Sequence, residues 1–396
     1  MNLHKTFVVL LALLLAGMAM VPMVSAELTR ATSDIETKID QNFISKDTAF
    51  QSATVAVKDF VSRGALDSDW DNAIVKSTPD IIYDLNGKPL FYLFSVEKDK
   101  KRIGEVKAAA SKVIGGAIVT IGSGAGSIDM NLARTHAREI IDKKYEGAAI
   151  NVMDLVSYNY PRIGIKVRYS VPGAKEKTMI LDAYDFSVIP ESQQVSFYNE
   201  IPASELSTRI TNAESEQNFL MNPPTGSLVK AGATKTLSGF PLYGQEGSAW
   251  CPFATAKMIS GYYSLSRTQT GIASTMGISN PDNGATIEQT LSNYYQVSSN
   301  SGGLGKPSSQ LVYTGQFTYI DFVNNLSANR PQHTDRYETS SFHARAVAGY
   351  SYSSSTSQYL YIYDPYPVNQ GAISWENYNT FMSGSNPVHG VIFIRN

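Results

Sequence analysis

Apolar residues recur at helical intervals between residues 33 and 61, in a segment that opens with a Ser33–Glu36 capping-box spacing and ends at Gly64. This pattern predicts one or two helices. In residues 80–100, DIIYDLNGKPLFYLFSVEKDK, two strand-like runs flank Asn86-Gly87, a dipeptide typical of a tight hairpin turn. We therefore expect a hairpin after the helical segment.

Helical and strand patterns continue to alternate further along the chain. Residues 117–122 (AIVTIG) form a strand candidate, and residues 131–145 (NLARTHAREIIDKKY) carry a helical pattern. Residues 153–171 and 176–189 then alternate apolar and polar positions, as antiparallel strands do. The order helix, strands, helix, strands predicts an α+β layer.

The composition changes near residues 223–231. From Pro223 onward, nine Lys or Arg and eight Asp or Glu make seventeen charged residues in 174 positions, whereas the first 222 positions hold the other 51. Fifteen of the 23 tyrosines fall in the second part. The segment MNPPTGSLVKAGATK between them has the Pro, Gly and Thr of a junction, so we expect two separately folded units.

The first residues predict a targeting segment. Lys5 precedes an apolar run from Phe7, which ends in Val24-Ser25-Ala26, the order typical of a secretory signal peptide cleaved after Ala26. An uncleaved anchor is the alternative, because Phe7 to Val24 reaches the lower length limit of a bilayer span. No later stretch is long and apolar enough to span, so we expect a secreted or cell-surface protein without a stable membrane partner.

Charge and cysteine content narrow the function classes. The net charge of −2 gives no reason to expect nucleic acid as a partner. A single cysteine means that no internal disulfide can form. The glycine stretch IGSGAGSIDM (121–130) lacks both the P-loop ending and the dinucleotide spacing, and no His or Cys pair has metal-ligand spacing. We therefore expect no cofactor and no metal.

Cys251 lies in YGQEGSAWCPFATAKM (243–258), directly before Pro252 and a run with helical periodicity. Because proline is favoured in the first helical turn, Cys251 is expected at or beside a helix N-cap, where free backbone N–H groups stabilise a thiolate. Position alone leaves three alternatives open: a nucleophile, a buried small hydrophobe, or half of an intermolecular disulfide.

Three other residues favour the nucleophile. Gln245 lies six positions before Cys251, where its amide N–H and the Cys251 backbone N–H could form an oxyanion hole. His343 begins one alternating strand and Asp364 ends the next, and neighbouring antiparallel strands can set an imidazole against a carboxylate. The carboxylate would hold one ring nitrogen and leave the other for the thiol.

These pieces resemble the papain-like cysteine peptidases, and specifically the compact branch that includes bacteriocin-leader-processing and staphopain- or streptopain-type peptidases. The resemblance covers about residues 236–390, in the segments GQEGSAWC, NNLSANRPQ, HARAVAGY, YIYDPY and ISWENY. It implies a papain-like fold, in which a helix carrying the cysteine packs on an antiparallel sheet carrying histidine and aspartate. Cys251 would be the nucleophile, Gln245 the oxyanion donor, His343 the general base and acid, and Asp364 its orienting partner. Pro252 and the spacing of 21 between His343 and Asp364 depart from the family pattern.

The resemblance also suggests roles for the other segments. We expect a signal peptide over 1–26, a propeptide-like or accessory α+β domain over 27–225, and a peptidase domain over 226–396. Parts of the first domain are similar to streptopain propeptides and PepSY-like modules. The chain would then be a zymogen acting on peptide or protein substrates, with its own N-terminal region as intramolecular inhibitor.

Several alternatives stay open from the sequence. The N-terminal region could be a permanent accessory domain, and the same catalytic residues could hydrolyse or transfer peptide cross-links of a cell envelope. A non-catalytic papain-like binding protein is a further alternative. Among the other histidines, His389 is expected to be structural and His333 to lie in a loop. Residues 280–289 (NPDNGATIEQ) predict a turn and a helix capped by Thr286 and Gln289 rather than a calcium loop.

Overall fold

The computed structural model describes residues 35–222, 233–338, 341–354, 357–382 and 388–396. The predicted signal peptide, the predicted junction from Pro223 to Ala231 and Ser33 of the capping box lie outside these residues. We refer to residues 35–222 as the N-terminal part and to residues 233–396 as the C-terminal part. Within the described ranges, no helix has both the length and the apolar character needed to cross a bilayer.

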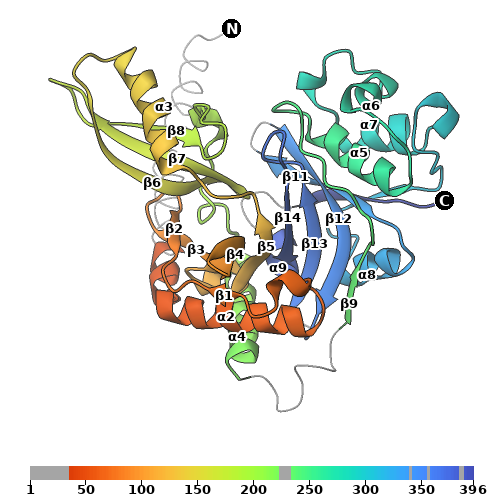
Figure 1. The fold of residues 1–396 in the computed structure, drawn as a ribbon, viewed down its shortest axis with the longest axis horizontal. Helices are drawn as coiled ribbons and strands as arrows, with labels where there is room; N and C mark the ends of the chain where they lie inside the picture. The colour runs from red at the N-terminus through yellow and green to blue at the C-terminus, as the bar shows by residue number, and fades with distance from the viewer. Residues whose placement is uncertain (1–34, 223–232, 339–340, 355–356, 383–387) are drawn as a thin grey trace, which may run out of the picture.

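The strands of both parts belong to one mixed sheet, which confirms the expected α+β class (Figure 1). Only the β2–β6 pair is parallel among the described pairs. The main path of the sheet runs β10 (Gln310–Tyr313), β15 (Val388–Phe393), β11 (Gln332–Glu338), β12 (Ser341–Tyr352), β13 (Gln358–Asp364), β14 (Ala372–Asn377), β5 (Ile118–Gly124), β4 (Lys101–Ala109), β3 (Pro89–Lys98), β2 (Asp80–Tyr83), β6 (Ala149–Asn159), β7 (Arg162–Ser170) and β8 (Lys177–Asp182). Beside this path, β1 (Ile74–Val75) pairs with β3, and β9 (Ala233–Thr236) pairs with β12.

The N-terminal part has the helices and the hairpin that its pattern predicts. Residues 35–41 are helical, and α2 (Lys46–Ser62) follows, capped by the Ser45 side chain, which accepts from the Thr48 backbone N–H at 3.1 Å. The β2–β3 hairpin turns at Gly87, which has a φ of +86°, a value that glycine adopts without strain. Helix α3 (Met130–Asp142) covers β6–β8 in the upper left of Figure 1.

Helix α4 (Leu206–Met221) was not predicted from the sequence. Its buried positions are Arg209, Ala213, Glu216 and Leu220, so the face that packs inward is half polar and gives no apolar stripe. The two charged side chains on that face are accommodated by hydrogen bonds. Arg209 binds Glu205 one turn earlier, and Glu216 accepts the Ala117 backbone N–H at 2.7 Å.

The C-terminal part places helices on its own section of the sheet. Helix α5 (Cys251–Tyr262) packs against β12, and α6 (Gln269–Thr275) and α7 (Ile287–Thr290) lie next to α5 in the upper right of Figure 1. Helix α8 (Tyr319–Ser327) packs against β12 and β9, and α9 (Tyr378–Met382) against β13 and β14. This part has its own buried hydrophobic cluster, which includes Phe253, Met258 and Val347.

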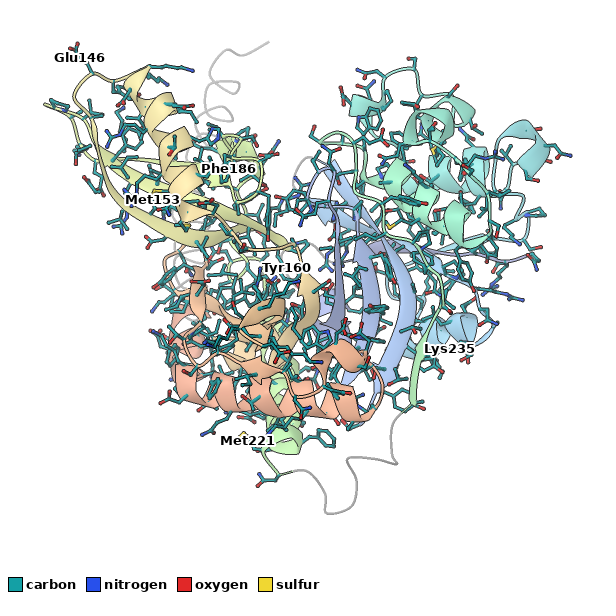
Figure 2. The ribbon with its side chains drawn as sticks, in the orientation of Figure 1. Glu146, Met153, Tyr160, Phe186, Met221 and Lys235 are labelled. Carbon is teal, nitrogen blue, oxygen red and sulfur yellow. The ribbon has the colours of Figure 1, made fainter. Side chains whose placement is uncertain are left out.

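The two parts are joined edge to edge through β5 and β14, which pair antiparallel. Buried contacts reinforce this joint: the Trp375 indole N–H donates to the Ala65 carbonyl at 2.8 Å, and the rings of Phe60 and Tyr359 meet at 4.8 Å. Tyr160, at the turn between β6 and β7, also lies at the boundary of the two parts (Figure 2). The two expected units therefore share one sheet.

Candidate active site

Cys251 is the first residue of helix α5, and Trp250 is its N-cap residue. Pro252, in the first turn, has the restricted φ that suits this position and lacks only an N–H that would have no intrahelical partner. Nine of the twelve residues of α5 are buried, so the helix is enclosed on most sides. Cys251 itself is only 3% exposed, which places the thiol beneath the surface.

The structure brings His343 and Asp364 together. They lie near the facing ends of β12 and β13, which are adjacent and antiparallel. The Nε2 of His343 lies 2.8 Å from Oδ1 of Asp364, and the same oxygen accepts the Tyr366 backbone N–H at 2.9 Å. A carboxylate held by two donors fixes the ring that it binds.

The environment of this pair shifts the pKa of both residues. Burial alone would lower the pKa of His343, but the charge and hydrogen bond of Asp364, with a smaller contribution from Cys251, raise it to about 10. Burial would likewise raise the pKa of Asp364, but His343, with smaller contributions from Arg345 and the Tyr366 N–H, holds it below its ordinary value. The imidazolium–carboxylate pair is therefore the stable state at neutral pH.

The thiol of Cys251 is a neighbour of the His343 ring. It contributes to the raised pKa of His343, so the two groups interact. The hydrogen bond of Sγ, however, goes to the Phe342 carbonyl at 3.6 Å, and Nδ1 of His343 has no hydrogen-bond partner among the described residues. The thiol and the ring are therefore adjacent, in a contact that falls outside ordinary hydrogen-bond geometry.

Gln245 lies in the loop that leads to Cys251 and is hydrogen-bonded to the residue after Asp364, but its amide does not have the expected free N–H. Its backbone N–H donates to the Pro365 carbonyl at 2.9 Å, which ties its loop to the end of β13. Its side chain is buried, and Nε2 donates to the carbonyls of Gly247 at 2.8 Å and Ser248 at 3.0 Å. Gln245 can donate to an oxyanion only after one of these two hydrogen bonds breaks.

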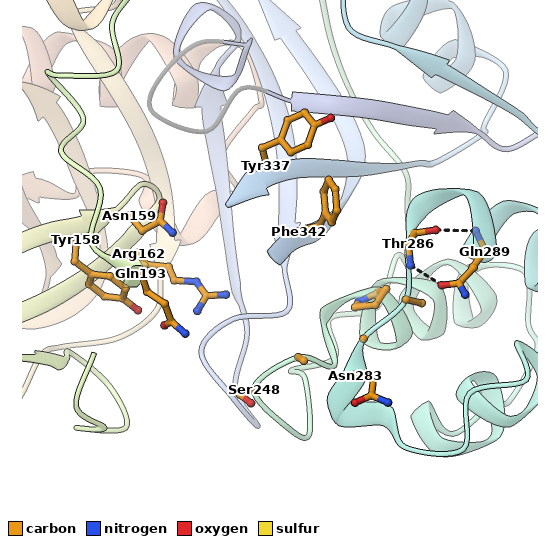
Figure 3. Close-up of a pocket in the computed structure, with 14 residues that line it drawn as sticks. Tyr158, Asn159, Arg162, Gln193, Ser248, Asn283, Thr286, Gln289, Tyr337 and Phe342 are labelled. Atoms are coloured by element: carbon orange, nitrogen blue, oxygen red, sulfur yellow. Dashed lines mark hydrogen bonds between the residues drawn. The ribbon is translucent and has the colours of Figure 1, made fainter. Parts of the chain in front are cut away.

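A cleft of about 580 Å³ lies next to these residues, between the two parts of the chain. The N-terminal part lines one side with Tyr158, Asn159, Arg162 and Gln193, and the C-terminal part lines the other with residues that include Ser248, Pro252, Asn283, Thr286, Tyr337 and Phe342 (Figure 3). Arg162 is the charged residue of this lining. Cys251 is beside Pro252 in sequence but does not itself line the cleft.

The other histidines do not join this group. The expectation that His333 lies in a loop is wrong: it is on β11, fully buried, with Nδ1 2.8 Å from the Tyr295 hydroxyl. His389 lies on β15 within an aromatic cluster that includes Tyr337 and Phe342. Among the described residues, no three His, Cys, Asp or Glu side chains are grouped to hold a metal ion. The capping box of Thr286 and Gln289 is confirmed at the start of α7 (Figure 3).

Sequence reasoning missed a second group of charged residues behind the His343–Asp364 pair. Arg345, two positions after His343, is buried and donates to Oε2 of Glu376 at 2.6 Å. The Tyr160 hydroxyl, from the N-terminal part, donates to the other oxygen of Glu376 at 2.9 Å. Arg345 could have been suspected, because residues i and i+2 of a strand point to the same face. Nothing in the sequence pattern indicates that Tyr160 would reach this group.

Comparison with known proteins supports a cysteine peptidase of the papain-like type. Residues 237–383 match the family model described as Peptidase_C39 like family, and this range contains Gln245, Cys251, His343 and Asp364. The match lies within the C-terminal part and includes none of the N-terminal part. No curated protein matches the chain.

Proposed function

We propose that this chain is a secreted cysteine peptidase in which Cys251 attacks a peptide carbonyl and His343 moves the protons. The main support is the His343–Asp364 pair, a buried ring and a largely buried carboxylate with 2.8 Å between Nε2 and Oδ1, next to a thiol at the start of a helix. The family match over residues 237–383 is consistent with this chemistry. Among the histidines that the structure describes, His343 has both a carboxylate within hydrogen-bond distance and an interacting cysteine, whereas the carboxylate nearest His333 lies at 3.7 Å.

The reaction follows from the positions of these groups. The Cys251 thiolate forms a bond to the carbonyl carbon, and the peptide oxygen becomes an oxyanion that the Cys251 backbone N–H, with Gln245 if its amide is freed, stabilises. Imidazolium His343 gives its Nδ1 proton to the leaving amine, the C–N bond breaks, and a thioester remains. His343 then takes a proton from water, which attacks the thioester; the C–S bond breaks, the carboxylic acid product leaves, and the Cys251 thiolate and the His343 imidazolium are restored.

Asp364 and the cleft have distinct roles in this proposal. Asp364 holds Nε2 of His343, so that Nδ1 stays directed at the thiol. The cleft between the two parts is the proposed site of an extended peptide, with Phe342 and Pro252 nearest the reacting carbonyl. No bound metal or cofactor is needed for these steps.

We further propose that the intact chain is a latent form, as expected of a zymogen. Three observations support this. Cys251 is 3% exposed, and its thiol is hydrogen-bonded to a backbone carbonyl. The side-chain amide of Gln245 donates both of its N–H groups to two other backbone carbonyls. Activation would follow a cut in the junction near Pro223 to Ala231, with the N-terminal part as the inhibiting element.

A second candidate for the N-terminal part is a permanent accessory domain. The observation in its favour is the β5–β14 pairing, with the buried contacts of Trp375 and Tyr359 across it. A prosegment that shares a sheet with its enzyme has to break backbone hydrogen bonds before it leaves. A cut in the junction that leaves activity unchanged would favour this candidate.

Labelling with a peptidyl electrophile tests the proposed nucleophile, on both the intact chain and the chain cut in the junction. We expect one adduct per chain at Cys251 in the cut chain, found by mass spectrometry, slower labelling of the intact chain, and at least about a 100-fold slower reaction in His343→Ala than in the parent protein. His333→Ala is the matched control, because it also removes a buried histidine but leaves the site intact. Equal labelling of the His343→Ala and parent proteins would contradict the proposal.

A further inference from the structure

The buried charges behind the His343–Asp364 pair form a branched arrangement. The Arg345 guanidinium lies between two carboxylates: its Nη1 is 2.6 Å from Glu376 Oε2 and 4.0 Å from Asp364 Oδ2. All three residues are shielded from solvent, with exposed side-chain fractions of 3% for Arg345, 2% for Glu376 and 15% for Asp364. At such sites a cation binds strongly to whichever carboxylate it reaches.

Asp364 therefore has two competing partners. If Arg345 moved to Asp364, the guanidinium would share the carboxylate with His343 and weaken its hold on the ring. The guanidinium has room to do so, because it lines a cavity of about 80 Å³, and its Nε and Nη2 have no hydrogen-bond partner among the described residues. Glu376 is the group that draws Arg345 the other way.

Glu376 is itself held from both parts of the chain. Tyr160, on the turn after β6, donates to its Oε1 at 2.9 Å (Figure 2 shows Tyr160 beside the C-terminal sheet). Arg336 on β11 approaches the same oxygen at 3.6 Å and is fully buried. The position of Glu376, and through it that of Arg345, thus depends on a residue of the N-terminal part.

We propose that Glu376 is a positioning residue that keeps the Arg345 guanidinium away from Asp364. The Asp364 carboxylate is thereby left to His343, and the hydrogen bond of Tyr160 makes the N-terminal part a component of the arrangement. The inference rests on the peptidase function proposed above.

Other charged and titratable groups also face this site. Those around Asp364 are Cys251 on α5, His343 and Arg345 on β12, Glu376 on β14, Glu105 and Lys107 on β4, Tyr160 before β7, Tyr184 after β8 and Tyr366 after β13. Of the other cations, Arg336 approaches Oε1 of Glu376, and Glu105 acts on Lys107 more strongly than Asp364 does. Arg345 is therefore the cation whose displacement would change the pKa of His343.

The test uses the chain without its predicted signal peptide and follows alkylation of its only cysteine by iodoacetamide as a function of pH. The rate should show a step where His343 loses its proton, near pH 10 in the parent protein. In Glu376→Gln the freed guanidinium should compete for Asp364, and the step should move down by about one pH unit or more. Tyr160→Phe should move it in the same direction by less.

Two variants separate positioning from loss of structure. The double variant Glu376→Gln with Arg345→Gln should return the step to the parent pH or above it, because no cation is left to compete. Tyr198→Phe, which removes another buried hydroxyl of the N-terminal part that binds a backbone carbonyl at 2.7 Å, should leave the step unchanged. Circular dichroism identifies any variant that does not fold. If Glu376→Gln does not fold, the shift of the step in Tyr160→Phe tests the positioning role of Glu376 instead.

The outcomes distinguish this inference from the function on which it rests. If His343→Ala alkylates with the parent pH profile, the proposed function fails. If His343→Ala removes the step but Glu376→Gln and Tyr160→Phe leave it in place, the function stands and the inference is wrong. A step that stays low in the double variant also contradicts it.

Discussion

His343 and Asp364 show how burial and a charged partner act against each other at the scale of single residues. Burial alone would make the ring neutral at physiological pH, yet the carboxylate raises the pKa of His343 to about 10. Such a residue holds its proton until the leaving group of a peptide requires it. The pair therefore supplies an acid at a pH where free imidazole would be mostly neutral.

The substitution Asp364→Asn should remove most of this effect. We expect the upper limb of kcat/KM against pH to move from near 10 toward, or below, the ordinary imidazole value of about 6.5, with about a 100-fold loss at pH 7. The matched control is Asp335→Asn, since Asp335 is buried on the same sheet 3.7 Å from His333. An upper limb that stays near 10 in Asp364→Asn would show that Asp364 does not set the protonation of His343.

The sequence anticipates these residues unevenly. Cys251, His343 and Asp364 are identifiable from their order, from the helix that begins at Cys251 and from the strands that carry the other two, and the structure places the last two in contact. Their catalytic roles remain predictions. The occupied amide of Gln245 could not be anticipated, because the carbonyls of Gly247 and Ser248 take it through the local shape of a loop.

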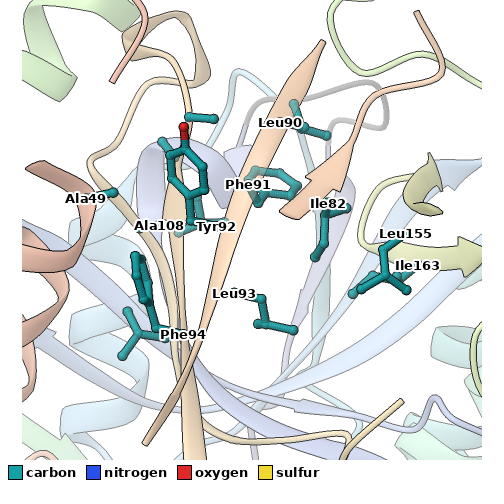
Figure 4. Packing of buried hydrophobic residues seen from close by; sticks show 14 of the residues in the cluster. Ala49, Ile82, Leu90, Phe91, Tyr92, Leu93, Phe94, Ala108, Leu155 and Ile163 are labelled. Carbon is teal, nitrogen blue, oxygen red and sulfur yellow. The ribbon is translucent and has the colours of Figure 1, made fainter. Parts of the chain in front are cut away.

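At the scale of elements, strands and helices follow local patterns wherever one face is apolar. Strand β3 is an exception: Leu90, Phe91, Tyr92, Leu93 and Phe94 are all buried (Figure 4). Phe94 packs on Phe50 of α2, whereas Phe91, on the other face, packs on Tyr160 and Phe197. The Asn86-Gly87 turn nevertheless predicts that this continuous apolar run is a strand. Helix α4 escaped prediction because its buried face includes Glu216 and Arg209.

Glu216 gives helix α4 a pH-dependent contribution to stability. It accepts hydrogen bonds from the Ala117 N–H, the Asn377 amide and the Tyr359 hydroxyl, without an ion pair among the described residues. Burial raises its pKa to about 7, only partly opposed by these bonds. Because the folded state then holds a proton that the unfolded state releases at about 4.5, stability should fall as pH rises from about 4.5 to 7.

We predict that Glu216→Gln removes this loss. Between pH 5 and 8 the parent protein should lose about 3 kcal/mol more of its free energy of unfolding than the variant, as measured by denaturant titration at each pH. Glu214→Gln is the matched control, because Glu214 lies on the same helix but is half exposed and paired with Lys112. Parallel pH dependence in the parent and Glu216→Gln proteins would contradict the prediction.

The whole molecule is organised by the shared sheet. The change in charge and tyrosine content predicts two parts, and each has its own buried core. The joint could not be predicted, since β5 and β14 are about 250 residues apart and no local pattern specifies which strand edges pair. The consequence is that the N-terminal part both lines the cleft and contacts the charges behind His343.

The shared sheet predicts that a cut in the junction leaves the two parts associated. After cleavage at a protease site inserted within residues 223–232, both parts should elute together in size-exclusion chromatography. Gly122→Val should release them, because a Cβ at Gly122 would lie 2.5 Å from the Ile373 carbonyl oxygen across the joint. Gly173→Val, strained at φ +72° but with nothing within 4 Å, is the control that should stay associated. Separation of the parent parts on cutting would favour a released prosegment instead.

The proposed role of Cys251 as the nucleophile of a peptidase can be tested by following the intact mass of residues 27–396 over time under reducing conditions, beside Cys251→Ala. We expect processing near residue 223 that requires the thiol and reductant and that the variant lacks. Cys251 is not the nucleophile of a peptidase if both proteins stay whole and the thiol still resists an active-site thiol probe after the N-terminal part has been cut off.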